Sequence, residues 1–364
     1  MAYYAIKGGE EAIKNSLNFY NDFTKNSEKI EDYDLIEAFT FSIDKVMSEG
    51  SLYSKKLASQ AIKRSAGDLL NASFFLRAHR SSCQRIGICK ELDVNDMRLS
   101  RRISSAFKDI EGGQLLGASN DYEVKLLVDI KNEKVDIKNY SNKNNVIKSA
   151  LTPLREDNLI KILPKEDEPW DITRVFPTAP YPRSSVLQVM SRGESGTLLG
   201  FAYTSMRGYG DVHPTIGDLR IGELDIKFIH PFTKKEVKIG SIEASAVESA
   251  GTFNKDENGD TKLTTGFGFC FGKNETKAIS MSIIDLTLYN NSYTVGTEQI
   301  VASDFEMVMH HVDGIESFGF ANHYKLPHYV TFQTDYQIFK SAKKYVDEQN
   351  RKDVDGDIKW DMHF

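Results

Sequence analysis

A run of polar and basic side chains near residue 100 has the spacing of a phosphate-binding surface. Its members are Arg98, Arg101, Arg102 and Ser105. Intervals of three and four residues place such side chains on one face of a helix. Lys108 and a glycine-rich stretch over 112–117, which contains Gln114, follow directly. Guanidinium groups bind phosphate oxygens through paired donors, and a glycine-rich turn lets backbone N–H groups approach an anion. We therefore expect a polyphosphate site here; a solvated helix face that ends in a turn is the alternative.

A second segment, residues 207–214, combines an aromatic ring with groups that bind phosphate or carry a proton. Arg207 and Tyr209 lie in an Arg-Gly-Tyr-Gly sequence, and His213 follows. The ring of Tyr209 can stack on a nucleotide base while Arg207 contacts a phosphate. An ordinary turn is equally compatible with this pattern.

The third candidate site is a pair of histidines, His323 and His328, separated by Pro327. The proline is incompatible with a regular helix, and a bent loop can bring the two imidazoles together. Neutral imidazole suits zinc, but a catalytic zinc site needs about three protein ligands. The missing ligand must then come from a distant residue or from another chain. A purely structural role of the two histidines is the alternative.

Composition excludes several classes of protein. The 364 residues are 40% hydrophobic and 27% charged, as in ordinary globular proteins. A formal net charge of -6 is unlike that of a general nucleic-acid binder. The three cysteines, Cys83, Cys89 and Cys270, are too few for a disulfide framework and indicate a reducing compartment. No signal peptide or membrane-spanning run is apparent, so we expect a cytoplasmic protein with no membrane partner.

The elements that must position these residues indicate an α+β fold, with helices first and an antiparallel sheet packed with helices after them. Apolar residues recur at helical intervals between Leu35 and Met47, and Asp68 can cap a further helix. We also predict a helix through the basic run, because Leu99, Ile103 and Phe107 follow one another at steps of four.

The second half has the alternation of strands. Strands are predicted over 221–229 and 237–242, and Phe267, Phe269 and Phe271 should share one sheet face. Asn274 is placed to cap the next helix, and 332–346 is predicted to form the last one. Residues 131–145, of which nine are Lys or Asn, read as an exposed insertion. The predicted domains are a helical part at 1–125, an insertion or linker at 126–180, an α+β part at 181–346 and a tail at 347–364.

Taken together, these segments resemble the PhnI subunit family of the bacterial carbon–phosphorus lyase core complex. The matching stretches keep their order along nearly the whole chain: 5–10, 46–50, 75–78, 101–110, 112–117, 183–185, 207–210 with His213 and Pro214, and 325–330. The resemblance fails over about 125–170 and after Asp347.

The resemblance implies a reaction at C1′ of ATP. With companion subunits, an alkylphosphonate displaces adenine and gives ribose 1-alkylphosphonate 5-triphosphate; alone, the subunit is a purine nucleotide nucleosidase. A separate radical subunit with an iron–sulfur cluster then cleaves the carbon–phosphorus bond, so no such cluster is expected on this chain. His323 and His328 correspond to metal ligands at the junction with that lyase subunit, and zinc is the metal that we expect there. The subunit is expected in two copies.

Departure of a purine requires protonation of the base and a negative charge near C1′. The sequence does not single out the acid, and His213, Asp304 and Glu306 are the candidates. A scaffold subunit that holds nucleotide and metal, with catalytic groups supplied by its partners, is the alternative function.

Overall fold

The computed structural model describes residues 9–25, 30–121, 147–164, 166–206, 214–255, 259–290, 301–326 and 329–358. The chain divides into two compact units, Met1–Glu316 and Ser317–Phe364. The predicted insertion at 131–145 lies outside the described residues, and the predicted domain limits stay predictions.

The first part of the chain is helical, as predicted. Its helices are α1 (Glu10–Lys25), α2 (Asp32–Ala38), α3 (Thr40–Gly50), α4 (Lys55–Arg64) and α5 (Leu69–Ser82). Helices α2 to α5 share an apolar core that includes Ile43 and Leu76. The predicted cap of α5 is confirmed, since the Asp68 carboxylate accepts the N–H groups of Leu70 and Asn71. The periodic run from residue 35 is two helices, because the backbone leaves helical geometry at Phe39.

In the described part of the chain, four strands form one antiparallel sheet in the order β1-β2-β3-β4. They are β1 (Arg98–Ile103), β2 (Thr215–Ile229), β3 (Glu236–Lys255) and β4 (Thr261–Phe271). The strands predicted over 221–229 and 237–242 are both confirmed, as β2 and β3, and are longer than expected. The alternation in β4 is also confirmed: the three phenylalanines are half-buried, while Cys270 between two of them is fully buried.

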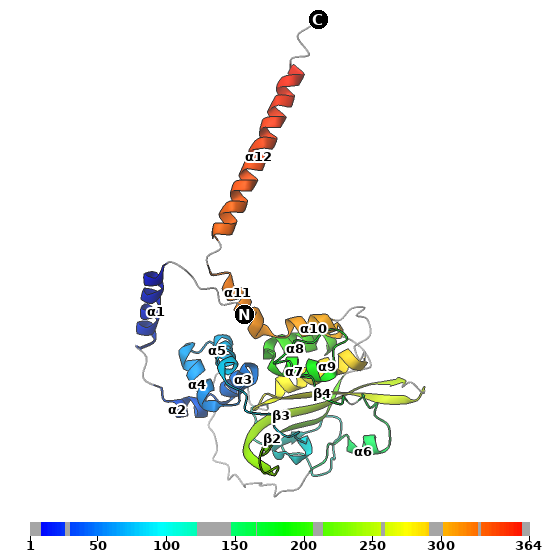
Figure 1. Cartoon of the computed structure of the whole chain (residues 1–364). Helices are drawn as coiled ribbons and strands as arrows, with labels where there is room; N and C mark the ends of the chain where they lie inside the picture. The colour runs from blue at the N-terminus through cyan, green and yellow to red at the C-terminus, as the bar shows by residue number, and fades with distance from the viewer. Residues whose placement is uncertain are drawn as a thin grey trace, which may run out of the picture. The chain divides into compact units, whose positions relative to one another are not determined.

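Helices cover one face of this sheet (Figure 1). They are α7 (Arg183–Arg192), α8 (Ser195–Met206), α9 (Glu275–Asn290) and α10 (Phe305–His311). Glycines in β4 allow α9 to lie against the strand, because a Cβ at Gly266 or Gly268 would be 2.0 Å from a carbonyl oxygen of α9. The opposite face packs against the segment that contains Met97 and the short 3-10 helix η1 (Val94–Asp96). The predicted α+β class is therefore confirmed.

The helix predicted through residues 98–107 is wrong, because this segment forms the edge strand β1. Asp93 caps only the single turn η1, and the chain then pairs with β2, more than one hundred residues later. A bulge at Ser100 shifts the register between Leu99 and Arg101. Adjacent side chains of a strand point to opposite faces, so Arg101 and Arg102 do not share a surface.

The remaining elements are α6 (Thr152–Glu156), η2 (Val301–Ser303), α11 (Gly314–His323) and α12 (Tyr329–Ile358). The last helix confirms the prediction over 332–346 and continues into the segment predicted as a tail. No helix in the described part of the chain has the length and apolarity needed to cross a membrane.

Candidate functional site

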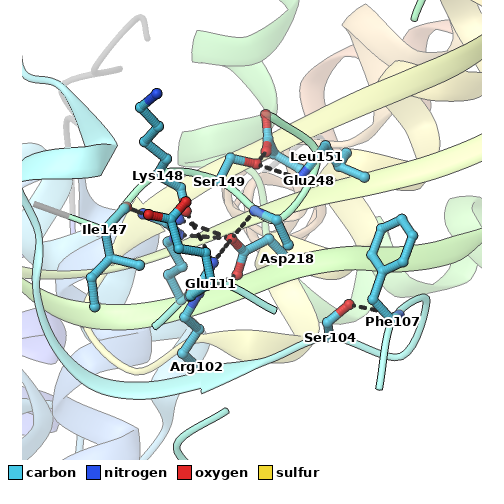
Figure 2. A network of polar contacts seen from close by, with 12 residues as sticks. Arg102, Ser104, Phe107, Glu111, Ile147, Lys148, Ser149, Leu151, Asp218 and Glu248 are labelled. Atoms are coloured by element: carbon cyan, nitrogen blue, oxygen red, sulfur yellow. Dashed lines mark hydrogen bonds and ion pairs between the residues drawn. The ribbon is translucent and has the colours of Figure 1, made fainter. Parts of the chain in front are cut away.

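Arg102 is part of a buried structural network and is not available to a ligand (Figure 2). Its Nε and Nη2 atoms donate to the Asp218 carboxylate at 3.2 and 3.0 Å, and its guanidinium also donates to the carbonyl oxygens of Glu111 and Lys148. Arg220 donates to the same carboxylate at 2.9 and 3.0 Å. These contacts join β1 and β2 to residues 147–150. The prediction that Arg102 belongs to an exposed basic stripe is therefore wrong.

Three further members of the predicted phosphate surface also have local structural roles or lie at the surface. Arg98 is exposed and forms ion pairs with Glu223 and Asp225 across the strands. The Gln114 amide is used by the chain itself: its oxygen accepts the N–H of Ser104 and its nitrogen donates to the carbonyl oxygen of Lys108. The side chain of Lys108 is exposed. None of the three lines either of the two cavities described next.

Arg101 lies on the other face of β1, in a cavity of about 400 Å³ between the sheet and the helices. We call it the helix-side cavity. Residues of α3, β1, the loop 118–121 and the start of α9 line it, and its basic side chains are Lys45, Arg101, Lys273 and Lys277. Gly117 brings the loop close to β1, since its φ is +64° and a Cβ would lie 2.4 Å from the carbonyl oxygen of Ser100. Arg101, one of the predicted phosphate ligands, therefore lines a cavity together with three lysines that the sequence analysis did not single out.

Arg101 forms ion pairs with two carboxylates that line this cavity. Its side chain is 3% exposed; Nε is 2.9 Å from Glu275 Oε1, and Nη2 donates to Asp121. Burial raises the pKa of Glu275 above its usual value, and the nearby charge of Asp121 adds to this rise, while Arg101 opposes it. The cavity therefore contains a carboxyl group that binds a proton more readily than an exposed glutamate does.

Lys45 of this cavity is held between two glutamates. Its Nζ atom lies 2.5 Å from Glu49 and 2.7 Å from Glu194. Burial alone would lower the pKa of Lys45, but the two carboxylates outweigh it and raise this pKa. The Glu49 carboxylate also accepts the N–H and Oγ of Ser195 at 2.9 and 2.8 Å, which fixes the start of α8 against α3.

Lys277 is buried without a carboxylate. It is 1% exposed, and its Nζ donates to Ser48 Oγ at 2.8 Å and to the carbonyl oxygen of Ser191 at 2.7 Å. No carboxylate of the described residues lies within ion-pair distance of it. Burial lowers the pKa of Lys277, and the nearby Cys270 and Glu49 oppose this shift only in part.

The start of α9 is fixed by α3. Asp44 accepts the backbone N–H of Lys273 at 2.9 Å, and its carbonyl oxygen accepts the amide of Asn274 at 3.0 Å. Asn274 occupies the predicted cap position, but its amide nitrogen donates to Asp44 and Phe271, and no bond from the helix to its side chain is formed. The prediction of a side-chain cap is therefore wrong.

A second cavity, of about 670 Å³, lies on the opposite face of the sheet. Asp218, Arg220, Glu248 and Arg155 line it, and these charges are already paired with one another. Ser149 also donates to Glu248. Because these four charged groups pair with one another, they are less available to an ionic ligand.

Of the catalytic candidates from the sequence, Asp304 and Glu306 line neither of the two cavities. Asp304 caps α10, where it accepts the N–H groups of Glu306 and Met307, and the Glu306 side chain is exposed. Arg207, Tyr209 and His213 lie outside the described residues, as does His328. His323 ends α11, where its ring lies 5.9 Å from that of Phe320 and 5.6 Å from that of Tyr324. Within the described ranges, no three His, Cys, Asp or Glu residues form a group that could hold a metal.

Comparison with known proteins agrees with the resemblance seen in the sequence. The model of the family described as "Bacterial phosphonate metabolism protein (PhnI)" matches residues 2–346. A putative C-P lyase subunit protein, HtxH of Stutzerimonas stutzeri, is 41% identical over 82% of this chain and 83% of its own length. Two proteins named alpha-D-ribose 1-methylphosphonate 5-triphosphate synthase subunit PhnI are each 34% identical. The one from Rhizobium meliloti covers 97% of this chain and 98% of its own length. The one from Escherichia coli covers 96% and 99%. The chain therefore belongs to the PhnI family of bacterial phosphonate metabolism proteins.

Proposed function

We propose that the chain is a subunit of a complex that converts ATP and an alkylphosphonate into ribose 1-alkylphosphonate 5-triphosphate and adenine. The bond from C1′ to the base breaks, a phosphonate oxygen bonds to C1′, and adenine leaves with a proton. One observation carries this proposal: the similarity to two relatives named as subunits of that synthase extends over 96–97% of the chain. Without companion subunits and phosphonate, water attacks C1′, so the isolated chain acts as a purine nucleotide nucleosidase.

The helix-side cavity is the site that suits this reaction. The triphosphate survives the reaction, so the site must hold it with cations and not with a nucleophile. The departing base requires a proton donor, and positive charge that develops at C1′ requires a nearby anion. Glu275, whose pKa burial raises, fits the first role, and Asp121 fits the second. Glu275→Gln should lower the rate of adenine release by a factor of about 10²–10⁴, whereas Glu156→Gln, a change at an exposed helix residue, should not.

We further propose that His323 and His328 bind zinc, with the remaining ligands from a companion subunit, the radical lyase. Imidazole is a ligand that zinc accepts, and a bound zinc ion would act there as a Lewis acid. Of the two histidines, the structure describes His323, which ends α11. One imidazole cannot complete a zinc site, so the proposal requires ligands from elsewhere. Elemental analysis of the purified complex should find zinc, and His323→Ala or His328→Ala should remove it. Full retention of zinc by both variants would rule out this assignment.

Exposed aromatic residues on α12 are consistent with assembly into a larger complex, for which we propose two copies of this chain. The exposed residues of this helix include Tyr329, Phe332, Tyr336 and Phe339. Their spacing of three and four residues places them along one side of the helix. An apolar row of this kind is typical of a protein–protein contact.

Incubation of ATP with the isolated chain, and with the complex and methylphosphonate, tests the proposed reaction. Free adenine, measured by chromatography, should appear in both cases. The alternative is a scaffold subunit whose catalytic groups come from its partners. It is favoured by the position of Asp304, a candidate acid that caps α10 and lines neither cavity. Adenine release by the complex but not by the homogeneous isolated chain would establish the scaffold function instead.

A further inference from the structure

Five arginines gather where the second half of α5 meets the end of α7 and the loop that contains Asp171. We call them the arginine cluster: Arg77, Arg80, Arg85, Arg174 and Arg192. The Asp313 carboxylate lies 2.6 Å from Arg77 Nη1 and 3.4 Å from Arg192 Nη2. Arg77 Nη2 also donates to the carbonyl oxygen of Arg192 at 2.6 Å. Two arginines of the cluster therefore share one carboxylate.

A second carboxylate, that of Asp171, is shared in the same way. It lies 2.7 Å from Arg85 Nη1 and 3.5 Å from Arg174 Nε. Arg80 follows one helical turn after Arg77 and is half-buried, yet its guanidinium has no hydrogen bond or ion pair among the described residues. One arginine of the cluster is thus left without an acidic partner in the described part of the chain.

The charges around Arg80 are mostly of its own sign. Burial lowers the pKa of Arg80, and the positive charges of three neighbours lower it further: Arg192, Arg77 and Arg85. Asp171 opposes this shift. An arginine keeps its proton at neutral pH, so the lowered pKa means that the charged side chain lacks a counter-charge.

The charges of the arginine cluster do not balance. The acidic residues that pair with its members or act on them are Asp171, Asp313 and the exposed Glu316. Five guanidinium groups therefore face three carboxylates. Arg80 and Arg192 lie in the last turns of α5 and α7, where a helix end contributes about half a negative charge. Two helix ends offset only about half of this excess, so a structural role at the helix ends does not account for all of it.

We propose that the arginine cluster binds a tetrahedral oxyanion of the phosphate or phosphonate type, with Arg80, Arg85 and Arg192 as its contacts. These three side chains are partly exposed, so an anion from solution can reach them. Arg77 is only 10% exposed and is held by Asp313 and backbone carbonyls, so it contributes its charge without a contact.

The excess charge and the kind of donor both favour this class of ligand. A phosphate monoester carries roughly 1.5–2 negative charges at pH 7, which matches the positive charge left over in the cluster. Guanidinium groups bind phosphate oxygens through paired donors. Three such groups suit an anion with three terminal oxygens better than a planar carboxylate with two. An alkylphosphonate as the natural ligand would rest on the proposed function, whereas the anion site rests on the cluster alone.

Calorimetric titration of the full chain with inorganic phosphate, methylphosphonate and acetate, at constant ionic strength, tests the proposal. Phosphate and methylphosphonate should bind, and the tighter of the two identifies the natural headgroup; acetate should bind at least about tenfold more weakly. Arg80→Met removes the unpaired charge and should weaken phosphate binding about tenfold or more. Arg98→Met is the matched control and should keep the affinity, because Arg98 lies on β1 outside the cluster and is 40% exposed, like Arg85 at 39%.

Thermal unfolding checks the folding of each variant and gives a second readout. Arg80→Met breaks no ion pair, so its unfolding temperature without ligand should not fall. Phosphate should raise the unfolding temperature of the wild-type chain but not that of the variant, because a ligand stabilises only the state that binds it. If Arg80→Met does unfold, Arg85→Met decides the outcome, since it changes a surface pair. No phosphate binding by the wild-type chain, equal binding of acetate, or wild-type affinity in the folded variants would overturn the proposal.

Failure of this site and failure of the proposed reaction are distinguishable. If the complex releases adenine while Arg80→Met binds phosphate as the wild type does, the reaction stands and this site is wrong. If Arg80→Met loses phosphate binding while the wild-type complex releases no adenine, the anion site stands and the reaction is wrong.

Discussion

Glu194 connects the start of α8 to α3, and its charge should make a measurable contribution to stability. Its carboxylate accepts the N–H of Thr197 at 2.7 Å and the Thr197 hydroxyl at 3.0 Å, and Lys45 Nζ lies 2.7 Å away. Burial alone would raise the pKa of Glu194, but these donors outweigh it and lower the pKa from 4.5 to about 2. A carboxyl group with a depressed pKa stabilises the fold above its unfolded pKa. This stabilisation is lost as the pH falls toward the folded value.

The magnitude follows from this difference in pKa. The change from 4.5 to about 2 is about 2.5 units, or roughly 3 kcal/mol at neutral pH, because one unit equals about 1.4 kcal/mol. The Glu194 side chain is only 13% exposed, so solvent screening reduces this figure little. Glu194→Gln keeps the shape of the side chain and removes the charge. The free energy of unfolding at pH 7 should therefore fall by roughly 3 kcal/mol.

Urea unfolding followed by circular dichroism between pH 7 and pH 3 measures this effect. The difference between wild type and variant should be largest above pH 5 and should shrink to roughly half near pH 3. Glu156→Gln is the control: its carboxylate is 64% exposed and 3.4 Å from Lys148, and such a surface pair contributes about 1 kcal/mol or less. A Glu194→Gln difference that is equal at pH 7 and pH 3, or below about 1 kcal/mol at pH 7, would refute the reasoning.

Two further predictions concern residues that the sequence analysis singled out. Arg102→Met should lower the free energy of unfolding by roughly 3–5 kcal/mol, because it removes one partner of a buried ion pair. Arg98→Ala, a change at an exposed residue, should alter this free energy by about 1 kcal/mol or less. Equal effects of the two changes in urea unfolding would contradict the assignment of Arg102 to a structural network. Burial raises the pKa of the Cys270 thiol to about 11, so iodoacetamide at pH 8 should modify exposed Cys83 and Cys89 in the folded chain but not Cys270. Mass spectrometry of peptides checks this, and rapid modification of Cys270 before unfolding would contradict it.

The elements that the sequence predicted correctly are those whose signals are local. Asp68 can be assigned as a cap from the residues beside it, and the alternation of phenylalanine with small residues in β4 follows from the two-residue period of a strand. The helix predicted over 98–103 was wrong because the structure of this segment depends on a distant partner. Its apolar residues happen to be four apart, while its true partner, β2, lies more than one hundred residues away. Strand propensity depends on such cross-strand neighbours more than on the segment itself.

The prediction that the arginines near residue 100 share one surface was wrong, because it assumed that this segment is a helix. Once the segment is a strand, the charge of Arg102 is used by Asp218 on one face, and only Arg101 reaches the helix-side cavity on the other. The basic groups that line this cavity come from α3, β1 and the start of α9, which are far apart in the sequence. No interval along the chain can reveal such a convergence.

One residue of the site did carry a signal in the sequence. Lys277, Met281, Ile284 and Leu288 follow one another at steps of four, three and four, and all four are buried. This is the periodicity of the apolar stripe by which a helix packs on a sheet, and a lysine has no place in such a stripe unless its charge is needed. The strand β4 and Gly272 directly precede this helix, so the lysine had to lie near its N-terminus. The Nζ atom of Lys277 donates to Ser48 of α3 and to the carbonyl oxygen of Ser191 in α7, so the lysine in this stripe joins α9 to both helices.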